Sequence, residues 1–133
     1  MNTTRNILAN SFSLSMIADM VWEDKGDNFA GLPISVKAVR PESIPSDIYS
    51  VVGHADTARV IGNIIGREVP VNRETYKAQP GDTIYVAQYT GPRLPEGATQ
   101  LPEGAEIRFY KIQEVQPDIG ALLGAVPFIG NVD

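Results

Sequence analysis

The sequence predicts one α/β (α+β) domain, in which a mixed β-sheet of about five strands is flanked by helices. Segments that alternate like strands are interleaved with two segments whose apolar residues recur at helical spacing. The chain has 133 residues, 43% of them hydrophobic, which suits a single core. We expect residues 1–115 to form the domain. Residues 116–133 are an apolar tail with glycine and proline that could pack on the core, mediate oligomer contacts or be flexible.

The first predicted elements are a strand and a helix. Residues 4–8 suit a short strand or its approach. Met16, Ile17 and Met20 then recur at helical spacing, which predicts a helix over residues 14–20.

A polar stretch and a second strand follow. Residues 22–28 are typical of a turn, and residues 29–39 predict a strand. Its alternation places three apolar side chains on one face: Ile34, Val36 and Ala38. Residues 41–47 contain Pro41 and Pro45 and are expected to be irregular.

The middle of the chain predicts a strand and then the strongest helix. Residues 48–52 are an apolar strand candidate that ends at Gly53-His54. Residues 55–66 predict an amphipathic helix, and Gly66 is a natural C-terminal stop. The stripe expected along this helix consists of Thr57, Ile61, Ile64 and Ile65.

The last third predicts three strands. They lie at residues 73–77, 83–89 and 106–115, with a turn at 80–82 and a proline- and glycine-rich loop at 90–104. The loop contains LPEGA twice, at Leu94–Ala98 and Leu101–Ala105. The repeat is too short for a solenoid and predicts two successive turns.

Charge and composition exclude several classes of function. The net charge of −5 argues against sequence-independent binding of long nucleic acid, which needs a basic surface. A small anionic ligand remains compatible, because a few arginines in a pocket can hold it. The chain has no cysteine and one histidine, so disulfides and cysteine nucleophiles are excluded and a zinc site is disfavoured. A carboxylate site for magnesium stays open, but we expect no metal and no cofactor.

We expect a cytoplasmic protein. No apolar run approaches the ~20 residues that cross a bilayer. The first ten residues lack the basic-then-apolar order of a signal peptide. The absence of cysteine fits a reducing compartment.

Gly53-His54 is the first candidate site, because it stands between a predicted strand and a predicted helix. Backbone N–H groups at a helix N-terminus attract anions. A histidine there can reach a bound phosphate, and its ordinary pKa suits proton transfer near neutral pH. The alternative is a histidine that caps the helix or packs against it.

The second candidate precedes the first helix and consists of Asn10, Ser11 and Ser13. Their amide and hydroxyl groups suit phosphate or ribose. The alternative is ordinary helix capping, which these residue types perform in most proteins, and taken alone these residues favour it.

The third candidate is the loop that begins at Gln88. Arg93 offers a planar fork that can hold a phosphate through two hydrogen bonds. Glu96 could orient a ribose hydroxyl or accept its proton, and Tyr89 could stack on a base. The alternative, common for such loops, is a rigid surface turn with an exposed Arg–Glu pair.

Three segments in this order resemble a known family. NSFSLSMI, VGHADTARVIGNIIG and the Gln…Arg-Leu-x-Glu-Gly loop are similar to segments of the viral ring nucleases, from about Leu8 to about Gln113. These are anti-CRISPR proteins of archaeal viruses and phages, and they destroy the cyclic tetra-adenylate messenger of type III CRISPR defence. No single motif is specific to the family, and the combination of the three is moderately specific.

The resemblance implies a homodimer, a ligand pocket across the dimer interface and cleavage without a metal. It implies that His54, within Gly-His-x-x-Thr, is catalytic, and that Arg93 and Glu96 match the family's arginine and glutamate. Ser13 and Asn10 match its serine and asparagine. The expected ligand-binding residues are Asn10, Ser11, Ser13, Gly53, Thr57, Gln88 and Tyr89, and the expected location is the cytoplasm of an infected host cell.

The chain also departs from the family's pattern. Four residues, Tyr89-Thr90-Gly91-Pro92, separate Gln88 from Arg93, whereas the glutamine of shorter members directly precedes the arginine. Ser15 stands where the family usually has asparagine, and the tail has no obvious counterpart. A changed loop could alter the preferred ring size or convert cleavage into sequestration. The alternative function is therefore a sponge that holds a cyclic nucleotide intact, and a structural or DNA-regulatory viral protein is a third.

Overall fold

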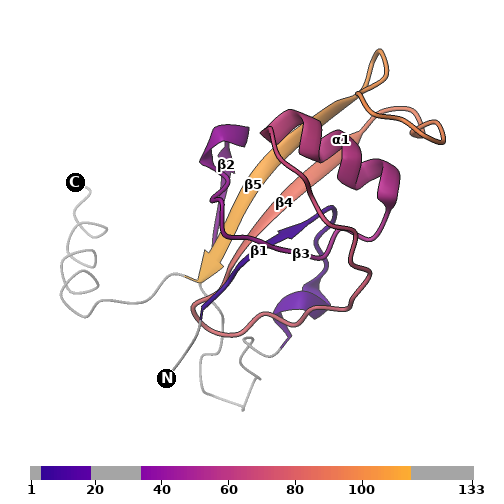
Figure 1. The fold of residues 1–133 in the computed structure, drawn as a ribbon. Coiled ribbons are helices and arrows are strands. Elements are labelled where there is room, and N and C mark those ends of the chain that lie inside the picture. The colour runs from indigo at the N-terminus through magenta and orange to yellow at the C-terminus, as the bar shows by residue number, and fades with distance from the viewer. Residues whose placement is uncertain (1–3, 19–33, 115–133) are drawn as a thin grey trace, which may run out of the picture.

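A computed structural model describes residues 4–18 and 34–114, which form a five-stranded mixed sheet with one α-helix (Figure 1). The strands are β1 (Asn6–Ala9), β2 (Ile34–Val39), β3 (Tyr49–Ser50), β4 (Thr83–Thr90) and β5 (Glu106–Glu114). The helices are α1 (Ala55–Ile65) and two short 3₁₀ segments, η1 (Leu14–Ile17) and η2 (Pro41–Ser43). This is the α+β fold that the sequence predicts.

The sheet order is β2-β5-β4-β1-β3. β1 runs parallel to both of its neighbours, with Leu8 opposite Ser50 in β3 and Tyr85 in β4. β5 runs antiparallel to β4 and to β2. The carboxyl ends of β1, β3 and β4 therefore lie at one edge of the sheet. In open sheets with parallel strands, ligands bind outside such carboxyl ends.

Alternation along the strands gives the sheet two apolar faces. Leu8 and Tyr85 belong to the core under α1, whereas Ile7, Ile84 and their neighbours belong to the core under η1. The α1 core is completed by the buried side chains Ile44, Val52, Ala58, Ile61, Val69, Ala87 and Phe109. Burial of each large aliphatic side chain stabilises the fold by roughly 1.5–3 kcal/mol, so α1 is held firmly over the sheet.

The α1 prediction is confirmed at both ends. His54 precedes the first turn with extended backbone (φ −126°), and Gly66 ends the helix with φ 80°. The N–H groups of Gly66 and Arg67 both donate to the carbonyl of Gly62, at 2.8 and 3.0 Å, in the manner of a Schellman stop. Of the expected stripe, Ile61 is fully buried and the other members are partly buried, while Ala58 and Val60 are buried as well.

The strand predicted at residues 73–77 is wrong. This segment has no strand pairing, and it crosses the η1 face with Tyr76 and Ala78 in the core. The Ala78 N–H donates to the Met16 carbonyl at 2.7 Å. Tyr76 and Ala78 are buried although the segment pairs with no strand, so its alternating pattern reflects packing over the sheet and not within it.

The turn predicted at residues 80–82 is confirmed, and hydrogen bonds to the side chain of Asp82 stabilise it. Asp82 is buried, and its carboxylate accepts hydrogen bonds from the N–H groups of Arg5 (3.0 Å) and Gln79 (2.9 Å) and from the Tyr76 hydroxyl (2.9 Å). A buried carboxylate is tolerated when it is fully hydrogen-bonded in this way.

Other predictions are confirmed in part. The first helix is the short η1, and its predicted end at Met20 lies outside the described residues, as do the turn at 22–28, the first part of the strand at 29–39 and the tail. β2 carries Val36, which is 61% exposed. Both LPEGA segments form turns: Ala98 N–H donates to Pro95 and Ala105 N–H to Pro102, each at 3.1 Å. Within the described ranges, no helix has the length and apolar character to cross a membrane.

Candidate functional site

His54 and Arg93 line one hollow of about 390 Å³ at the carboxyl edge of the sheet. The first turn of α1 forms one side of this hollow, and the connection from β4 to β5 forms the other side. Figure 1 shows this connection over the N-terminal part of the helix. Thr57 and Tyr89 also line it, together with Ala55, Asp56 and Leu94. Four residues expected at the site are thus brought together.

His54 occupies the N-cap position of α1, but its side chain makes no capping hydrogen bond. Its backbone carbonyl accepts from the Ala58 N–H at 2.9 Å, which starts the helix. The exposed imidazole stands where the unpaired N–H groups of the first turn give a positive potential. This arrangement suits an anion bound beside a group able to give or take a proton.

Arg93 is exposed, and within residues 4–18 and 34–114 its guanidinium forms no hydrogen bond or ion pair. The backbone of the loop that carries Arg93 is nevertheless restrained by two contacts. The Tyr89 hydroxyl donates to the Pro92 carbonyl, and Gly91 (φ 138°) approaches Ala105 so closely that a Cβ would lie 2.7 Å from its Cα. An unpaired guanidinium on a restrained loop is well suited to hold a phosphate.

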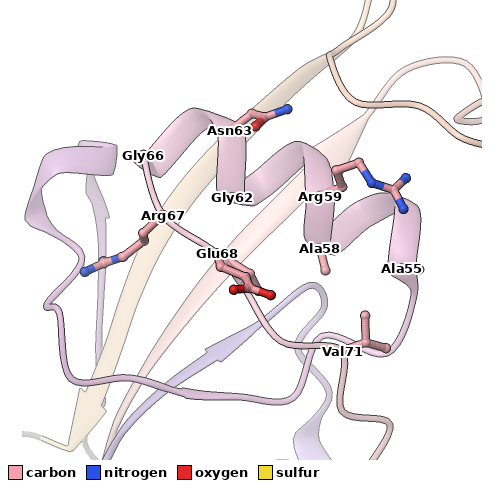
Figure 2. Close-up of a pocket in the computed structure, with 10 residues that line it drawn as sticks. Ala55, Ala58, Arg59, Gly62, Asn63, Gly66, Arg67, Glu68 and Val71 are labelled. Carbon is pink, nitrogen blue, oxygen red and sulfur yellow. The ribbon is translucent and has the colours of Figure 1, made fainter.

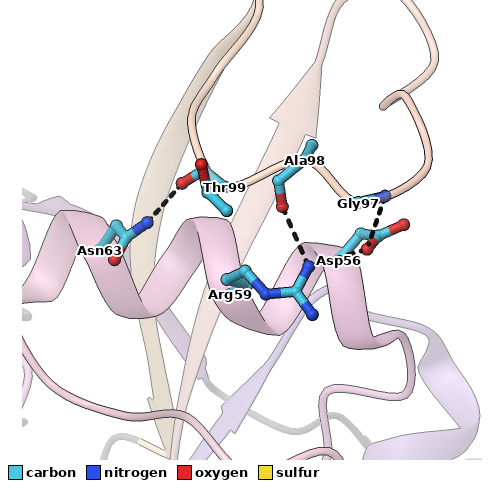
Figure 3. A network of polar contacts seen from close by, with 6 residues as sticks. All are labelled: Asp56, Arg59, Asn63, Gly97, Ala98 and Thr99. Carbon is cyan, nitrogen blue, oxygen red and sulfur yellow. Dashed lines mark hydrogen bonds and ion pairs between the residues drawn. The ribbon is translucent and has the colours of Figure 1, made fainter.

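Three polar side chains of α1 tie the far part of this loop to the helix (Figure 3). Asp56 accepts from the Gly97 N–H at 3.2 Å, Arg59 donates to the Ala98 carbonyl at 3.2 Å, and Asn63 donates to the Thr99 carbonyl. Asp56 and Arg59 also form an ion pair at 3.0 Å. We call Asp56, Arg59 and Asn63 the helix clasp. These contacts were not predicted from the sequence, although the spacing of three and four residues along one helix face was a usable signal.

The serine-rich candidate forms a second hollow, of about 240 Å³. Asn10, Ser11 and Ser13 line it together with Glu74, and none of its lining residues is shared with the His54 hollow. Ser13 is the N-cap residue of η1, but its hydroxyl makes no capping bond and lies 2.8 Å from the Ser15 hydroxyl. The side chains are therefore not consumed by capping.

Glu74 gives this second hollow a negative charge. Its carboxylate accepts from the Tyr49 hydroxyl at 2.5 Å and from the Asn72 amide at 3.0 Å, and these hydrogen bonds lower the pKa of Glu74. The Arg5 guanidinium lies over the Tyr49 ring, 4.6 Å from its centroid. A carboxylate among hydroxyl groups suits a ribose or an amine donor better than a phosphate.

The structure does not place the remaining expected residues in the His54 hollow. Gln88 lies with Arg108 and Tyr110 in a separate hollow of about 240 Å³ on another part of the sheet. Glu96 is exposed on the first LPEGA turn, and Gly53 is half-buried beside Arg73.

Another hollow, of about 480 Å³ and shown in Figure 2, was not predicted from the sequence. It runs along α1 past Ala58, Gly62 and Gly66, and it shares only Ala55 with the His54 hollow. Arg67 lies at its edge and donates to the Ile44 carbonyl at 2.8 Å. No group of three His, Asp or Glu side chains that could hold a metal occurs in the described part of the chain.

Comparison with known proteins finds one matching family model and a similar solved structure. The model of the STIV B116-like family matches residues 6–113. Among solved structures, B116 of Sulfolobus turreted icosahedral virus is similar in fold, with a TM-score of 0.57 and 18% sequence identity, over 82% of this chain and 98% of that one. No curated protein matches in sequence.

Proposed function

The chain belongs to the STIV B116-like family, and from that premise we propose that it is a viral anti-defence protein that binds a cyclic oligoadenylate and cleaves it without a metal. The resemblance to viral ring nucleases supplies the ligand class, cyclic tetra-adenylate. Loss of this messenger would block type III CRISPR signalling in the infected cell.

The observation that carries the proposal is the hollow shared by His54 and Arg93. A phosphodiester bound there meets three features that favour it: the positive end of α1, an unpaired guanidinium and an imidazole. Histidine is the side chain that most often transfers protons in catalysis near neutral pH. Tyr89, on the same wall, offers a ring on which a base can stack.

The proposed reaction uses the ligand's own ribose. The 2′-oxygen attacks the adjacent phosphorus in line, the bond from phosphorus to the 5′-oxygen breaks, and a 2′,3′-cyclic phosphate remains. Arg93 offsets the charge that develops on the phosphoryl oxygens, and His54 donates the proton that the departing 5′-oxygen needs. Such proton transfer contributes typically ~10²–10⁴-fold to the rate. Glu96 is proposed to orient the 2′-hydroxyl or accept its proton.

The size of the hollow supports a shared ligand. A volume of about 390 Å³ is at the lower end of small-molecule sites and suits one nucleotide unit rather than a ring. We therefore propose a homodimer in which each subunit provides one His54–Arg93 site, so that a four-membered ring has two scissile phosphates. The acidic second hollow at Glu74 is proposed to accept ribose hydroxyls of the same ring.

One observation favours the sponge as a second candidate. Glu96 lies outside the hollow that holds His54 and Arg93, so the cleavage mechanism lacks a positioned base for the 2′-hydroxyl within one subunit. A sponge needs only Arg93, the helix N-terminus and the aromatic side chain of Tyr89. It does not cut the cyclic ligand and releases it intact.

Chromatography of the ligand separates the two candidates. The full chain is incubated with cyclic tetra-adenylate and a panel of other cyclic oligonucleotides, then denatured, with and without EDTA. Linear products that form equally in EDTA support the ring nuclease, and intact ligand recovered from the protein supports the sponge. Absence of binding to the whole panel would contradict both.

A further inference from the structure

The helix clasp joins two parts of the chain that are distant in sequence but adjacent at the site. Asp56 stands in the first turn of α1, two residues after His54, and Gly97 to Thr99 follow Arg93 by a few residues (Figure 3). The three clasp side chains all contact backbone atoms of the loop. They therefore fix where the main chain runs without depending on the identity of the loop's side chains.

The clasp contacts lie on the flank of the helix, whereas the loop stem is closed independently. At the stem, Gly91 packs on Ala105 and Thr90 pairs with Glu106. Between the stem and the clasp stand Arg93 and the first LPEGA turn. Because the segment is anchored at both sides, its position over the N-terminus of α1 is determined jointly by the stem and by the clasp.

The clasp also sets the charge of the hollow. Asp56 lines the His54 hollow, and an anion there would repel a phosphate. Its carboxylate is offset by the Arg59 guanidinium at 3.0 Å and by the Gly97 N–H at 3.2 Å. Both partners point at the same oxygen, Oδ1. Loss of the Arg59 guanidinium would thus loosen the loop and leave the Asp56 charge beside the proposed phosphate position.

We propose that Asp56, Arg59 and Asn63 are positioning residues, which hold the loop so that Arg93 faces His54 across the space for one phosphodiester. This inference rests on the proposed function. The clasp residues touch the loop and not the reacting atoms, so they act through Arg93.

The test uses the full chain and two readouts. The first is amide hydrogen exchange at Gly97, which reports the clasp whether or not any ligand binds. The second is the affinity and single-turnover cleavage of cyclic tetra-adenylate. Asp56→Ala should speed Gly97 exchange about tenfold or more, and Asn63→Asp, which replaces the donor amide by a carboxylate facing the Thr99 carbonyl, should weaken ligand binding about 3- to 10-fold.

Two further variants separate positioning from general destabilisation. Asp56→Asn keeps an acceptor for the Gly97 N–H and should preserve its protection and most of the activity. Arg40→Gln changes an exposed arginine that makes no side-chain cap at η2 and should match the wild type in both readouts. Thermal unfolding of each variant tests whether the domain is still folded.

The outcomes are distinct. Unchanged Gly97 exchange in Asp56→Ala would overturn the clasp itself. A loosened loop with wild-type affinity and turnover would overturn its role in positioning Arg93. Absence of ligand binding by the wild type would overturn the proposed function, and with it the ligand part of the inference, while Gly97 exchange would still show whether the clasp exists.

Discussion

His54 and Arg93 meet at one hollow although they come from different connections of the sheet, one leading into α1 and the other leaving β4. Parallel pairing of β1 with both β3 and β4 puts the ends of those strands at the same edge. The fold therefore brings together an imidazole, a guanidinium and a helix N-terminus, which are three of the groups that the proposed chemistry uses.

Arg93 should dominate affinity for the ligand. A hydrogen bond to a charged group contributes about 1.5–3 kcal/mol, so Arg93→Ala should weaken binding of cyclic tetra-adenylate roughly 10- to 100-fold. Isothermal titration calorimetry measures this loss. Arg40→Ala, at an exposed arginine away from the hollow, is the matched control, and equal affinity of the two variants would refute the role of Arg93.

Glu96 can be tested against its own sequence repeat. Glu103 occupies the same position in the second LPEGA turn, which has the same 3.1 Å backbone hydrogen bond. If Glu96 activates the 2′-hydroxyl, Glu96→Gln should slow single-turnover cleavage by about 10²-fold, and Glu103→Gln should leave the rate unchanged. Equal rates in both variants would remove Glu96 from the mechanism.

Tyr76 should make stability sensitive to high pH. Burial, and then its hydrogen bond to Asp82, raise the pKa of Tyr76 to about 12 from 10.0. Because the folded state holds the proton more tightly than the unfolded state, its contribution of about 2 kcal/mol is present below pH 10 and is lost as the pH rises toward 12. Urea unfolding at pH 9 and at pH 11.5 should show a smaller loss for Tyr76→Phe than for the wild type. An identical loss in both would contradict this assignment.

Gly62 should reverse the usual order of helix propensity. Alanine within a helix is ordinarily more stable than glycine by about 1 kcal/mol. Here a Cβ at position 62 would lie 2.7 Å from the Arg67 carbonyl oxygen, so Gly62→Ala should lower the free energy of unfolding in urea. Gly97→Ala, where a Cβ meets open space but φ is 80°, separates the clash from backbone strain. A more stable Gly62→Ala variant would show that the loop after α1 moves aside easily.

Local patterns predicted the parts of the fold that local chemistry determines. α1 was evident from its apolar spacing and from Gly66, and the turns at Gly81, Gly97 and Gly104 all have the positive φ that favours glycine. The 73–77 segment misled because an alternating pattern shows only that alternate side chains are buried. It does not show whether the backbone hydrogen-bonds to a strand or crosses above the sheet.

The sequence could predict which residues belong to the candidate site, but only in part how those residues are arranged in space. His54 and Arg93 were identified from the helix start and the proline-rich loop, and the structure brings them together. The separation of Ser13 and Glu96 from that hollow depends on tertiary packing, which one sequence does not reveal. The clasp side chains share a helical spacing, but the partners of Asp56 and Asn63 are backbone atoms of a distant loop, which no residue pattern marks.

In the proposed reaction, His54 supplies the proton for phosphodiester cleavage without the help of a metal. The most direct measurement compares the wild type with His54→Ala in single-turnover cleavage of cyclic tetra-adenylate in the presence of EDTA, with binding measured in parallel. We expect linear products from the wild type, and from the variant a tightly bound but intact ring. Turnover at the wild-type rate by His54→Ala would contradict the proposed role of His54.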